Sequence, residues 1–585
     1  MTNTIPTSAS LLALTLAAGL GALASAGAAR AAPAACAGDN GGLKLPPGFC
    51  ATIFADHIGH ARDLAVAADG TVYVNTWSGR YYHNDTPHPG GFIVALKDTT
   101  GAGKADRIAR FGLTPDHGGH GGTGIYLYNG RVYAEEADRI DAYAVKPGEL
   151  APTAKAETVV SGMPLGGDHP MHPFIIDAKG DMFVDMGSAT NACQAENRQP
   201  RSPGLSPCTE LETRGGTWRF DANRMGQKYS AAARYATGIR NGEGFGIDSA
   251  GRLYVTQHGR DQLWANWPAL FKMRQSAELP AEEVVELKQG GDYGWPECYF
   301  DGTQGKLVLA PEYGGDGKKV GVCADKLAPV ASFPAHWAPN DLVVYKGDML
   351  PAAYKDALFI AFHGSWNRAP APQGGFNVVV QPMKDGKASG PWLTFADGFA
   401  AIKDPGAAKH RPSGVAVAPD GALFVSDDIG GTIYRITYNG DKGAAVAGVP
   451  DTPSQSNGLA DAQPPEGTHA DAGREAVGLQ PPEGATMADV VLGSRIFHGD
   501  EQEGTCAGCH GLKGQGGHQG PSLADHKWLW SDGSFKGIEQ TVALGVRKPK
   551  EFSGVMPPMG GSPLTPDGVK AVAAYVWAIS HKSGG

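Results

Sequence analysis

Short apolar triplets that follow turn residues recur between residues 69 and 425. Each copy has a turn containing Asp, Gly, Lys or Asn, then one variable residue, then three aliphatic or aromatic residues. This order is typical of a turn that leads into a buried strand. The copies are Asp69–Val74, Asn129–Ala134, Lys179–Val184, Ala250–Val255, Lys355–Ile360 and Asp420–Val425.

Six copies of one supersecondary unit predict an all-β, six-bladed β-propeller. The copies are spaced by about 50 to about 105 residues, so several blades must carry long loops. Such loops gather at one face of a propeller and can build a pocket there. The alternative is an irregular all-β sandwich whose turns match by chance. With Gly431–Ile436 as its last strand, the propeller is expected to cover residues 36–440.

The composition changes after the last predicted strand. Residues 441–484 are rich in Ala, Gly, Pro, Asp and Glu and contain QPPEG twice, which predicts a flexible linker. Residues 485–583 then form a second, small helical domain. Its last helix is signalled by Thr565 as a cap, Pro566 in the first turn, and an apolar run from Val569 to Ile579.

The N-terminus carries an apolar, Ala- and Leu-rich stretch over residues 11–29. It ends in small residues, with Ala24-Ser25-Ala26 as a cleavage site, so residues 1–32 predict a signal peptide and a periplasmic protein. An uncleaved anchor and lipid attachment at Cys36 are the alternatives. No later run approaches 18 apolar residues, so no membrane span is expected in the mature chain.

Composition narrows the function classes. The 585 residues include 84 Gly and 42 Pro, which favours turn-rich β structure. The formal net charge is −10, and no basic run suits a phosphate backbone, so no nucleic-acid partner is expected.

The string Cys506-Ala507-Gly508-Cys509-His510 is the attachment signature of a covalent c-type haem. One helical turn places both thiols beside the porphyrin, and His510 can then reach the iron. A zinc site would need a second ligand pair, and no cysteine follows Cys509. Residues 485–583 are therefore predicted to be a cytochrome c domain.

The sixth iron ligand should lie between this string and the last helix. Small cytochromes c commonly use the methionine directly before proline, which favours Met556 over Met559 in the string MPPM. His518 and His526 are weaker candidates.

Six further cysteines remain in an exported protein, and an even number suggests disulfides. Pairing between sequence neighbours is the expectation, among 15 arrangements. The expected pairs are Cys36–Cys50, Cys193–Cys208 and Cys298–Cys323.

Several strings in the propeller region resemble those of the soluble-type sugar dehydrogenases that depend on pyrroloquinoline quinone (PQQ), in the branch of the L-sorbosone dehydrogenases. The common order of the strings carries the resemblance. They are Met163–His169, Thr237–Asn241, Gly290–Pro296, His363–Arg368 and Arg411–Val415. The C-terminal segment resembles a class I cytochrome c.

The resemblance implies roles for individual residues. His169 would accept the substrate proton, with Asp168 orienting it, and His172 is a nearby competitor. Glu243 departs from the family, which often has Gln there; an acid beside an anionic cofactor is unexpected. The residues implied to bind the three carboxylates and the quinone of PQQ are Arg240, Asn241, Lys346, Arg368 and Arg411.

The resemblance also implies a calcium ion bound by the backbone carbonyls of Gly259 and Arg260. His120 would lie on the substrate side, and Trp295 would line the pocket, as would Trp366, although both tryptophans also suit a core.

Three functions are compatible with these features. The favoured one is a periplasmic quinohaemoprotein that oxidises a sugar, sugar aldehyde or polyol and passes electrons through its haem to a soluble cytochrome or an oxidase. A calcium-dependent propeller lactonase and a non-catalytic sensor propeller joined to a cytochrome are the alternatives.

Overall fold

The computed structural model describes residues 36, 38–77, 89–114, 121–146, 148–368, 371–403, 408–450, 452, 476 and 478–581, apart from 500, 503, 505, 512, 517–518 and 553. The predicted signal peptide, His120 and His518 lie outside the described residues.

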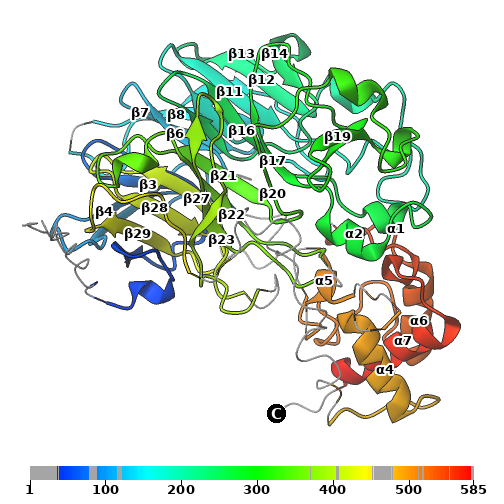
Figure 1. Ribbon diagram of the computed structural model, residues 1–585. Helices are drawn as coiled ribbons and strands as arrows, with labels where there is room; N and C mark the ends of the chain where they lie inside the picture. Colours follow the sequence, from blue (N-terminus) through cyan, green and yellow to red (C-terminus); the bar gives the residue numbers. More distant parts are fainter. Residues whose placement is uncertain are drawn as a thin grey trace, which may run out of the picture.

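The described part of the N-terminal region contains six sheets arranged around an axis, and all their strands pair antiparallel except β13, which is parallel to β9 (Figure 1). A seventh and an eighth sheet are short two-stranded additions, β18 (Cys298–Asp301) with β19 (Lys306–Leu309), and β24 (Met383–Lys384) with β25 (Lys387–Ala388). From the axis outward, the first two sheets are β2 (His60–Val66), β3 (Val72–Trp77), β4 (Ile93–Lys97) and β5 (Arg107–Phe111), and then β6 (Ile125–Tyr128), β7 (Arg131–Glu136), β8 (Arg139–Ala144) and β9 (Glu157–Ser161), with β13 (Gln227–Lys228) added. The third and fourth sheets are β10 (Phe174–Ile176), β11 (Asp181–Met186), β12 (Gly216–Asp221) and β14 (Arg234–Thr237), and then β15 (Phe245–Ile247), β16 (Leu253–Gln257), β17 (Glu282–Glu286) and β20 (Ala331–Phe333). The fifth and sixth sheets are β21 (Pro339–Val344), β22 (Leu358–Phe362), β23 (Asn377–Gln381) and β26 (Leu393–Ala396), and then β27 (Pro412–Val417), β28 (Leu423–Asp427), β29 (Ile433–Tyr438) and β1 (Phe49–Ala55).

The innermost strands close into a ring. Strands β2, β6, β10, β15, β21 and β27 each contact the next, and β27 contacts β2 again. The first strand of the chain, β1, completes the last sheet by pairing with β29, for example Ile53 opposite Tyr434. This closure ties the two ends of the domain together and leaves no open edge between the first and last blades. The predicted six-bladed propeller is confirmed.

Every copy of the sequence repeat forms the start of the second strand of a blade, namely β3, β7, β11, β16, β22 or β28. The turn before each strand requires a left-handed residue. Gly70 supplies it in the first copy, with φ of 82°, and Asp356 in the fifth, with φ of 57°. The repeat is thus one turn-strand unit used six times.

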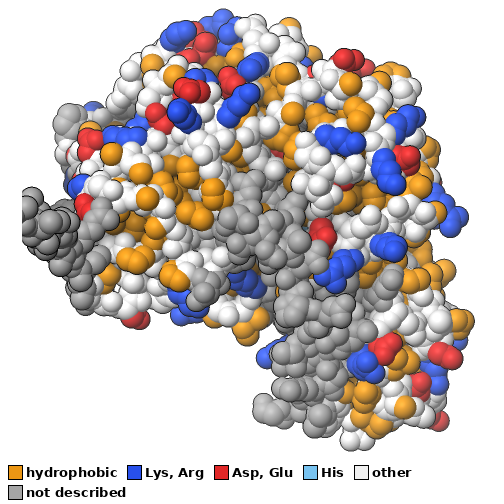
Figure 2. Space-filling model, in the orientation of Figure 1, with side chains coloured by type: hydrophobic (Ala, Val, Ile, Leu, Met, Phe, Trp, Pro, Cys, Tyr) orange, Lys and Arg blue, Asp and Glu red, His pale blue; other side chains and the backbone are white. Residues whose placement is uncertain are grey.

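Buried aromatic side chains fill the spaces between blades. Between the last two blades, Phe395 packs edge-on against Phe49 and Phe359, with ring centroids 4.8 Å apart in both cases. On the face shown in Figure 2, basic and acidic side chains are interspersed, with hydrophobic side chains between them.

The C-terminal region is a small helical domain with α4 (Met487–His498), α5 (Cys506–His510), α6 (Phe535–Leu544) and α7 (Pro566–Ser580). Thr565 caps α7, accepting a hydrogen bond from the Gly568 N–H, and Pro566 occupies the first turn, as predicted. Helices α4 and α7 approach closely because Gly493 has no side chain: a Cβ there would lie 2.0 Å from the Ala571 carbonyl oxygen.

The first part of the predicted linker is bound to the propeller. The Ala447 N–H donates to the Tyr354 hydroxyl and the Val449 N–H to the Thr394 carbonyl, at 2.9 and 2.8 Å. The chain therefore leaves the propeller about ten residues later than its composition suggests, and most of 451–477 lies outside the described residues.

Three disulfides join Cys36 to Cys50, Cys193 to Cys208, and Cys298 to Cys323. All three predicted pairs are confirmed. Among the described residues, no helix combines the length and apolar character needed to cross a bilayer.

Candidate functional site

A polar cavity lies where the second strands of the blades end and the innermost strands begin. The ends of β3, β16 and β22 contribute Trp77, His258 and His363, while the segments that lead into β10 and β15 contribute His169 and Arg240. Three of the lining residues thus lie at the end of a repeat strand or directly after it. The arginines and histidines of the described lining are Arg62, Arg198, Arg240, Arg411, His169, His258, His336 and His363.

His169 is held in one orientation by the loop after β11. Its Nδ1 lies 3.0 Å from both the carbonyl oxygen and the hydroxyl of Ser188. A proton on Nδ1 donated to that carbonyl leaves Nε2 with the free lone pair. Burial, together with the positive charges of Arg240 and Arg198, lowers the pKa of His169 well below its usual value. The ring is therefore neutral and able to accept a proton.

Asp168 does not orient His169, which corrects the expectation from sequence. Its carboxylate accepts from Arg198 Nε at 2.9 Å and from Asn197 Nδ2 at 3.3 Å. Ser188 takes the orienting role instead, because the peptide turns Asp168 toward Arg198. His172 is a structural residue: it is buried, does not line the cavity, and bonds Glu135 and the Pro164 carbonyl.

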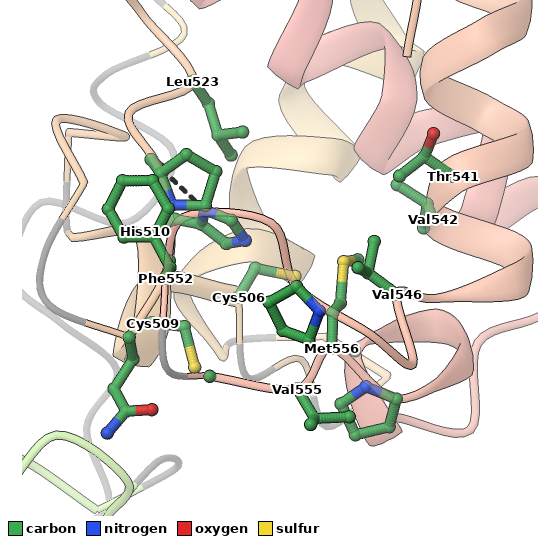
Figure 3. A pocket seen from close by; sticks show the side chains of 18 of the residues that line it. Cys506, Cys509, His510, Leu523, Thr541, Val542, Val546, Phe552, Val555 and Met556 are labelled. Atoms are coloured by element: carbon green, nitrogen blue, oxygen red, sulfur yellow. Dashed lines mark hydrogen bonds between the residues drawn. The ribbon is translucent and has the colours of Figure 1, made fainter. Parts of the chain in front are cut away.

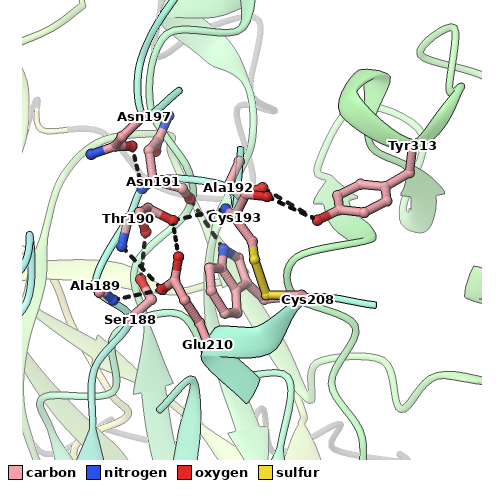
Figure 4. Close-up of a disulfide and its surroundings, with 11 residues drawn as sticks. Ser188, Ala189, Thr190, Asn191, Ala192, Cys193, Asn197, Cys208, Glu210 and Tyr313 are labelled. Carbon is pink, nitrogen blue, oxygen red and sulfur yellow. Dashed lines mark hydrogen bonds between the residues drawn. A yellow bond between two sulfur atoms is a disulfide. The ribbon is translucent and has the colours of Figure 1, made fainter. Parts of the chain in front are cut away.

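The loop that carries Ser188 is fixed at several points (Figure 4). The Glu210 carboxylate accepts from the backbone N–H groups of Ala189 and Thr190, at 2.8 and 3.1 Å, and from the Thr190 hydroxyl. The disulfide from Cys193 to Cys208 closes the loop next to these bonds. The loop after β11 is therefore held in a fixed position next to His169.

Arg240 lies in the wall of the cavity and is almost fully buried. Its guanidinium donates to both the carbonyl and the side-chain oxygen of Asn191 and pairs with Asp261 at 2.9 Å. Asp261 also pairs with Arg198 at 3.0 Å, and these two guanidinium groups lower the pKa of its carboxyl. Because Arg198 also pairs with Asp168 at 2.9 Å, two arginines and two carboxylates meet here, and their ion pairs hold both guanidinium groups in place.

Glu243 pairs with an arginine from another blade. It pairs with Arg62 at 2.9 Å and accepts from Asn241 Nδ2 at 3.0 Å. Arg62 in turn pairs with Asp428 at 3.0 Å, and Asp428 accepts from His363 Nε2 at 2.8 Å. The unexpected acid thus belongs to a buried ion-pair network rather than to an exposed negative site.

Arg62 and Arg198 were missed by the sequence reasoning. Arg62-Asp63 stands inside the otherwise apolar strand β2, and a charged pair in a buried strand is a signal of a polar interior. Arg198 lies in a loop and carries no comparable signal.

Three predicted residues do not line the cavity. Lys346 is exposed beyond the end of β21, so it does not fit a contact with the quinone. Arg368 is buried but donates to the carbonyls of Ala277 and Ala335, both at 2.8 Å. Trp295 lies behind the wall, where its indole N–H donates to the Asn191 carbonyl at 3.1 Å. Asn241 and Arg411 do line the cavity, whereas Arg368 and Trp295 support its walls.

The arrangement around Gly259 does not favour calcium. Its carbonyl accepts from Arg240 Nη1 at 3.0 Å, so a cation there would lie beside a guanidinium group. The Arg260 side chain points to Glu312, at 2.5 Å. The described residues contain no cluster of three acidic, histidine or cysteine side chains suited to a metal ion.

A second, largely apolar cavity lies in the helical domain (Figure 3). Cys506 and Cys509, which take no part in the three disulfides, are half-buried at its edge, and His510 follows on α5. His510 Nδ1 lies 2.9 Å from the Pro521 carbonyl, which leaves Nε2 for a metal. Gly520 keeps the ring clear, since a Cβ there would lie 3.0 Å from it. These residues fit a covalently attached haem.

The cavity distinguishes the candidate sixth ligands. Met556 lines it, and Figure 3 shows His510 and Met556 approaching from different segments. Met559 packs on the hydrophobic core and does not line the cavity. His526 is exposed and packs against His581. The geometry therefore agrees with Met556.

Comparison with known proteins identifies the family of both the propeller region and the helical region. Residues 43–439 match the family model described as TrAA12-like, and residues 490–580 match cytochrome c. The chain thus belongs to the TrAA12-like family and carries a C-terminal cytochrome c domain. An uncharacterized protein of Borreliella burgdorferi is 30% identical over 403 residues, covering 68% of this chain and 91% of that protein.

Other relatives have stated activities. A PQQ-dependent pyranose dehydrogenase of Coprinopsis cinerea is 28% identical over 232 residues, covering 34% of this chain and only 30% of that protein. A PQQ-dependent sugar dehydrogenase of Hypocrea jecorina is 23% identical over 341 residues, covering 55% of this chain and 75% of that protein. The cytochrome region is 35% identical over 91 residues to a cbb3-type oxidase subunit CcoP of Rubrivivax gelatinosus, covering 16% of this chain and 26% of the subunit.

Solved structures share the propeller fold. A Trichoderma reesei carbohydrate-active enzyme of family AA12 superposes with a TM-score of 0.54 at 18% identity, covering 68% of this chain and 98% of that one. The PQQ domain of the Coprinopsis cinerea pyranose dehydrogenase superposes with a TM-score of 0.51, also at 18% identity, covering 68% and 97%.

Proposed function

We propose that this protein is a quinohaemoprotein dehydrogenase that oxidises a sugar, a sugar aldehyde such as sorbosone, or a polyol with PQQ, and passes the electrons to its own haem c. The observation that carries the proposal is the pairing of two adjoining cavities, one lined by arginines and a neutral histidine and one built for a covalent haem. The membership of the TrAA12-like family and the activities of its relatives support it.

The chain's own residues would prepare the reaction. PQQ supplies a two-electron oxidation when bound, and haem supplies one-electron transfer. Arg198, Arg240 and Arg411 would donate hydrogen bonds to the carboxylates of the cofactor, since guanidinium groups pair well with carboxylates. His169 would take the proton of the substrate hydroxyl at Nε2, while Ser188 holds the opposite side of the ring. The Gly259 carbonyl is not available to calcium in this arrangement, because it accepts a hydrogen bond from Arg240 Nη1.

The place of the protein in the cell is part of the proposal. We infer that it works in the periplasm and delivers electrons to a soluble cytochrome or an oxidase. Three disulfides are typical of exported proteins, and the cytochrome region resembles an oxidase subunit.

The test is reconstitution of purified haem-containing protein with PQQ, with and without calcium, against a panel of sugars, aldehydes and polyols. Reduction of the haem band should require both PQQ and a substrate. A haem that stays oxidised throughout the panel would refute the proposal. Hydrolysis of lactones without haem reduction would support the lactonase instead.

A further inference from the structure

The two cavities share a wall. Trp366 and Asn367, in the loop after β22, line both the arginine-rich cavity and the haem cavity. Gln519, from the cytochrome domain, also lines both. Very few residues therefore separate the arginine-rich cavity from the haem cavity, and one of them is a half-buried tryptophan.

The haem-binding helix rests directly on this wall. Gly508, inside the Cys-Ala-Gly-Cys-His string, faces the Trp366 carbonyl: a Cβ at Gly508 would lie 2.4 Å from that oxygen. Real Cβ atoms do not approach a backbone oxygen so closely, so only glycine permits this contact. The edge of the haem cavity that carries Cys506 and Cys509 is thus the edge that meets the propeller.

The wall is also tied to the charged cluster of the other cavity. Asn367 Nδ2 donates to Asp261 at 2.7 Å, and Asp261 holds Arg198 and Arg240. Residues 366–367 therefore contact both the cofactor side and the haem side.

The propeller completes the haem cavity from α1 (Leu263–Asn266) and α2 (Met273–Glu278), which lie next to the helical domain in Figure 1. Trp264 and Met273 line the cavity. A Cβ at Gly561 would lie 3.2 Å from the Ala265 Cβ, so the two domains also pack closely here. Arg547 pairs with Glu196 at 3.5 Å across the boundary, although an exposed pair of this kind adds little.

We propose that Trp366 is the bridge through which electrons cross from the cofactor cavity to the haem. Gly508 permits this transfer because it lets the haem-binding helix lie directly against Trp366. The proposal rests on the proposed function. Oxidation of a C–H and O–H pair to a carbonyl releases two electrons and two protons. When both cofactors are bound, PQQ would take up the two electrons, the haem would accept them one at a time, and an external one-electron acceptor of the cytochrome or oxidase class would remove each before the next. The protons leave to solvent from the propeller side.

The first test is Gly508→Ala, which adds one methyl group against the Trp366 carbonyl and touches no predicted iron ligand. Alanine favours helix, so α5 should still form. The matched control is Gly390→Ala in the propeller, where a Cβ would meet no atom within 4 Å. In rapid-mixing experiments, Gly508→Ala should slow haem reduction by roughly tenfold or more, because the domains are held further apart. Reduction of PQQ by substrate should be unchanged, as should both steps in the control.

A measurement on protein without PQQ tests the docking of the two domains independently of enzyme activity. Small-angle scattering should give a larger radius of gyration for Gly508→Ala than for wild type or Gly390→Ala. Wild-type haem reduction in Gly508→Ala would overturn the inference. Failure of sugars to reduce PQQ in the wild-type protein would refute the proposed function instead, so the two failures are distinguishable.

The second test separates the bridge from the docking. Trp366→Phe retains an aromatic ring, whereas Trp366→Leu removes it. With the radius of gyration unchanged in both, Trp366→Leu should slow haem reduction relative to PQQ reduction, and Trp366→Phe should slow it less. Equal haem reduction rates in wild type and Trp366→Leu would show that Trp366 is not the bridge.

Discussion

At the scale of single residues, His169 shows how its surroundings, rather than its sequence neighbour, prepare a base. Ser188 fixes Nδ1, and burial together with the charges of Arg240 and Arg198 lowers the pKa of the ring and keeps it neutral. His169→Ala should lower the rate of PQQ reduction by substrate by about 10²–10⁴, the usual contribution of general base catalysis. PQQ should still bind, because the arginines remain. Rapid-mixing absorbance of the cofactor measures both quantities.

The pH dependence of the same step follows from the lowered pKa of His169. The neutral ring is the active form, so a lowered pKa extends activity to more acidic solution. The wild-type rate should stay level as the pH falls through the ordinary histidine value of 6.5 and decline only below it. His172→Ala is the control, since His172 lies outside the cavity and should affect stability more than rate. A large loss of rate in His172→Ala with a normal His169→Ala would reverse the two roles.

The iron ligand is a second prediction at this scale. Met556 lines the haem cavity and Met559 does not. Met556→Ala should therefore abolish the long-wavelength charge-transfer band of methionine-ligated Fe(III), while Met559→Ala should retain it. The haem should resist extraction by acid and acetone in both variants, because attachment uses Cys506 and Cys509. Loss of the band only in Met559→Ala would reassign the ligand.

The network around Arg62 gives a third prediction. Arg62→Met leaves Glu243 and Asp428 without their shared guanidinium, and breaking a buried ion pair typically costs about 3–5 kcal/mol. Glu243→Gln retains a hydrogen-bond acceptor, and Arg62 keeps Asp428. Denaturant unfolding should show a much smaller loss for Glu243→Gln, and its affinity for anionic PQQ should rise. Equal loss of stability in both variants would contradict the network.

At the scale of elements, the loop after β11 positions the base, and Glu210 positions the loop. Removing three hydrogen bonds in Glu210→Ala should cost about 1–3 kcal/mol and release Ser188 from His169. The rate of PQQ reduction should then fall and its pH profile should shift. Glu212→Ala is a matched control, because Glu212 ends the same short 3₁₀ helix and is exposed. A changed unfolding curve with an unchanged pH profile would assign Glu210 a purely structural role.

Local patterns predicted these elements well and the contacts between them poorly. The six turn-strand copies, the capped helix α7 and the three neighbouring disulfides depend on short stretches of sequence, and all were found. The pairing of Arg62 with Glu243 joins residues 181 positions apart, which no local pattern contains. For the same reason, the sequence alone could not predict that Lys346 lies at the surface or that Ser188 binds His169 Nδ1.

At the scale of the whole molecule, the propeller and the cytochrome domain enclose the haem cavity together, because the propeller's own helices α1 and α2 contribute to its lining. The covalent connection through residues 451–477 keeps the two domains at a high effective concentration. Association between them should therefore not depend on protein concentration, as it would for two separate proteins.

Kinetics can test this arrangement directly. A propeller truncated after Pro450 should still reduce an artificial dye with substrate, because the described lining of the arginine-rich cavity comes from the propeller, apart from Gln519. Adding separate cytochrome domain should restore haem reduction at a rate that rises with its concentration. In the intact chain, haem reduction after rapid mixing should instead be independent of protein concentration, since the tether fixes the local concentration of the partner. If the rate in the intact chain rises in proportion to protein concentration, electrons pass between molecules, and the contact of Gly508 with Trp366 is not the route they take.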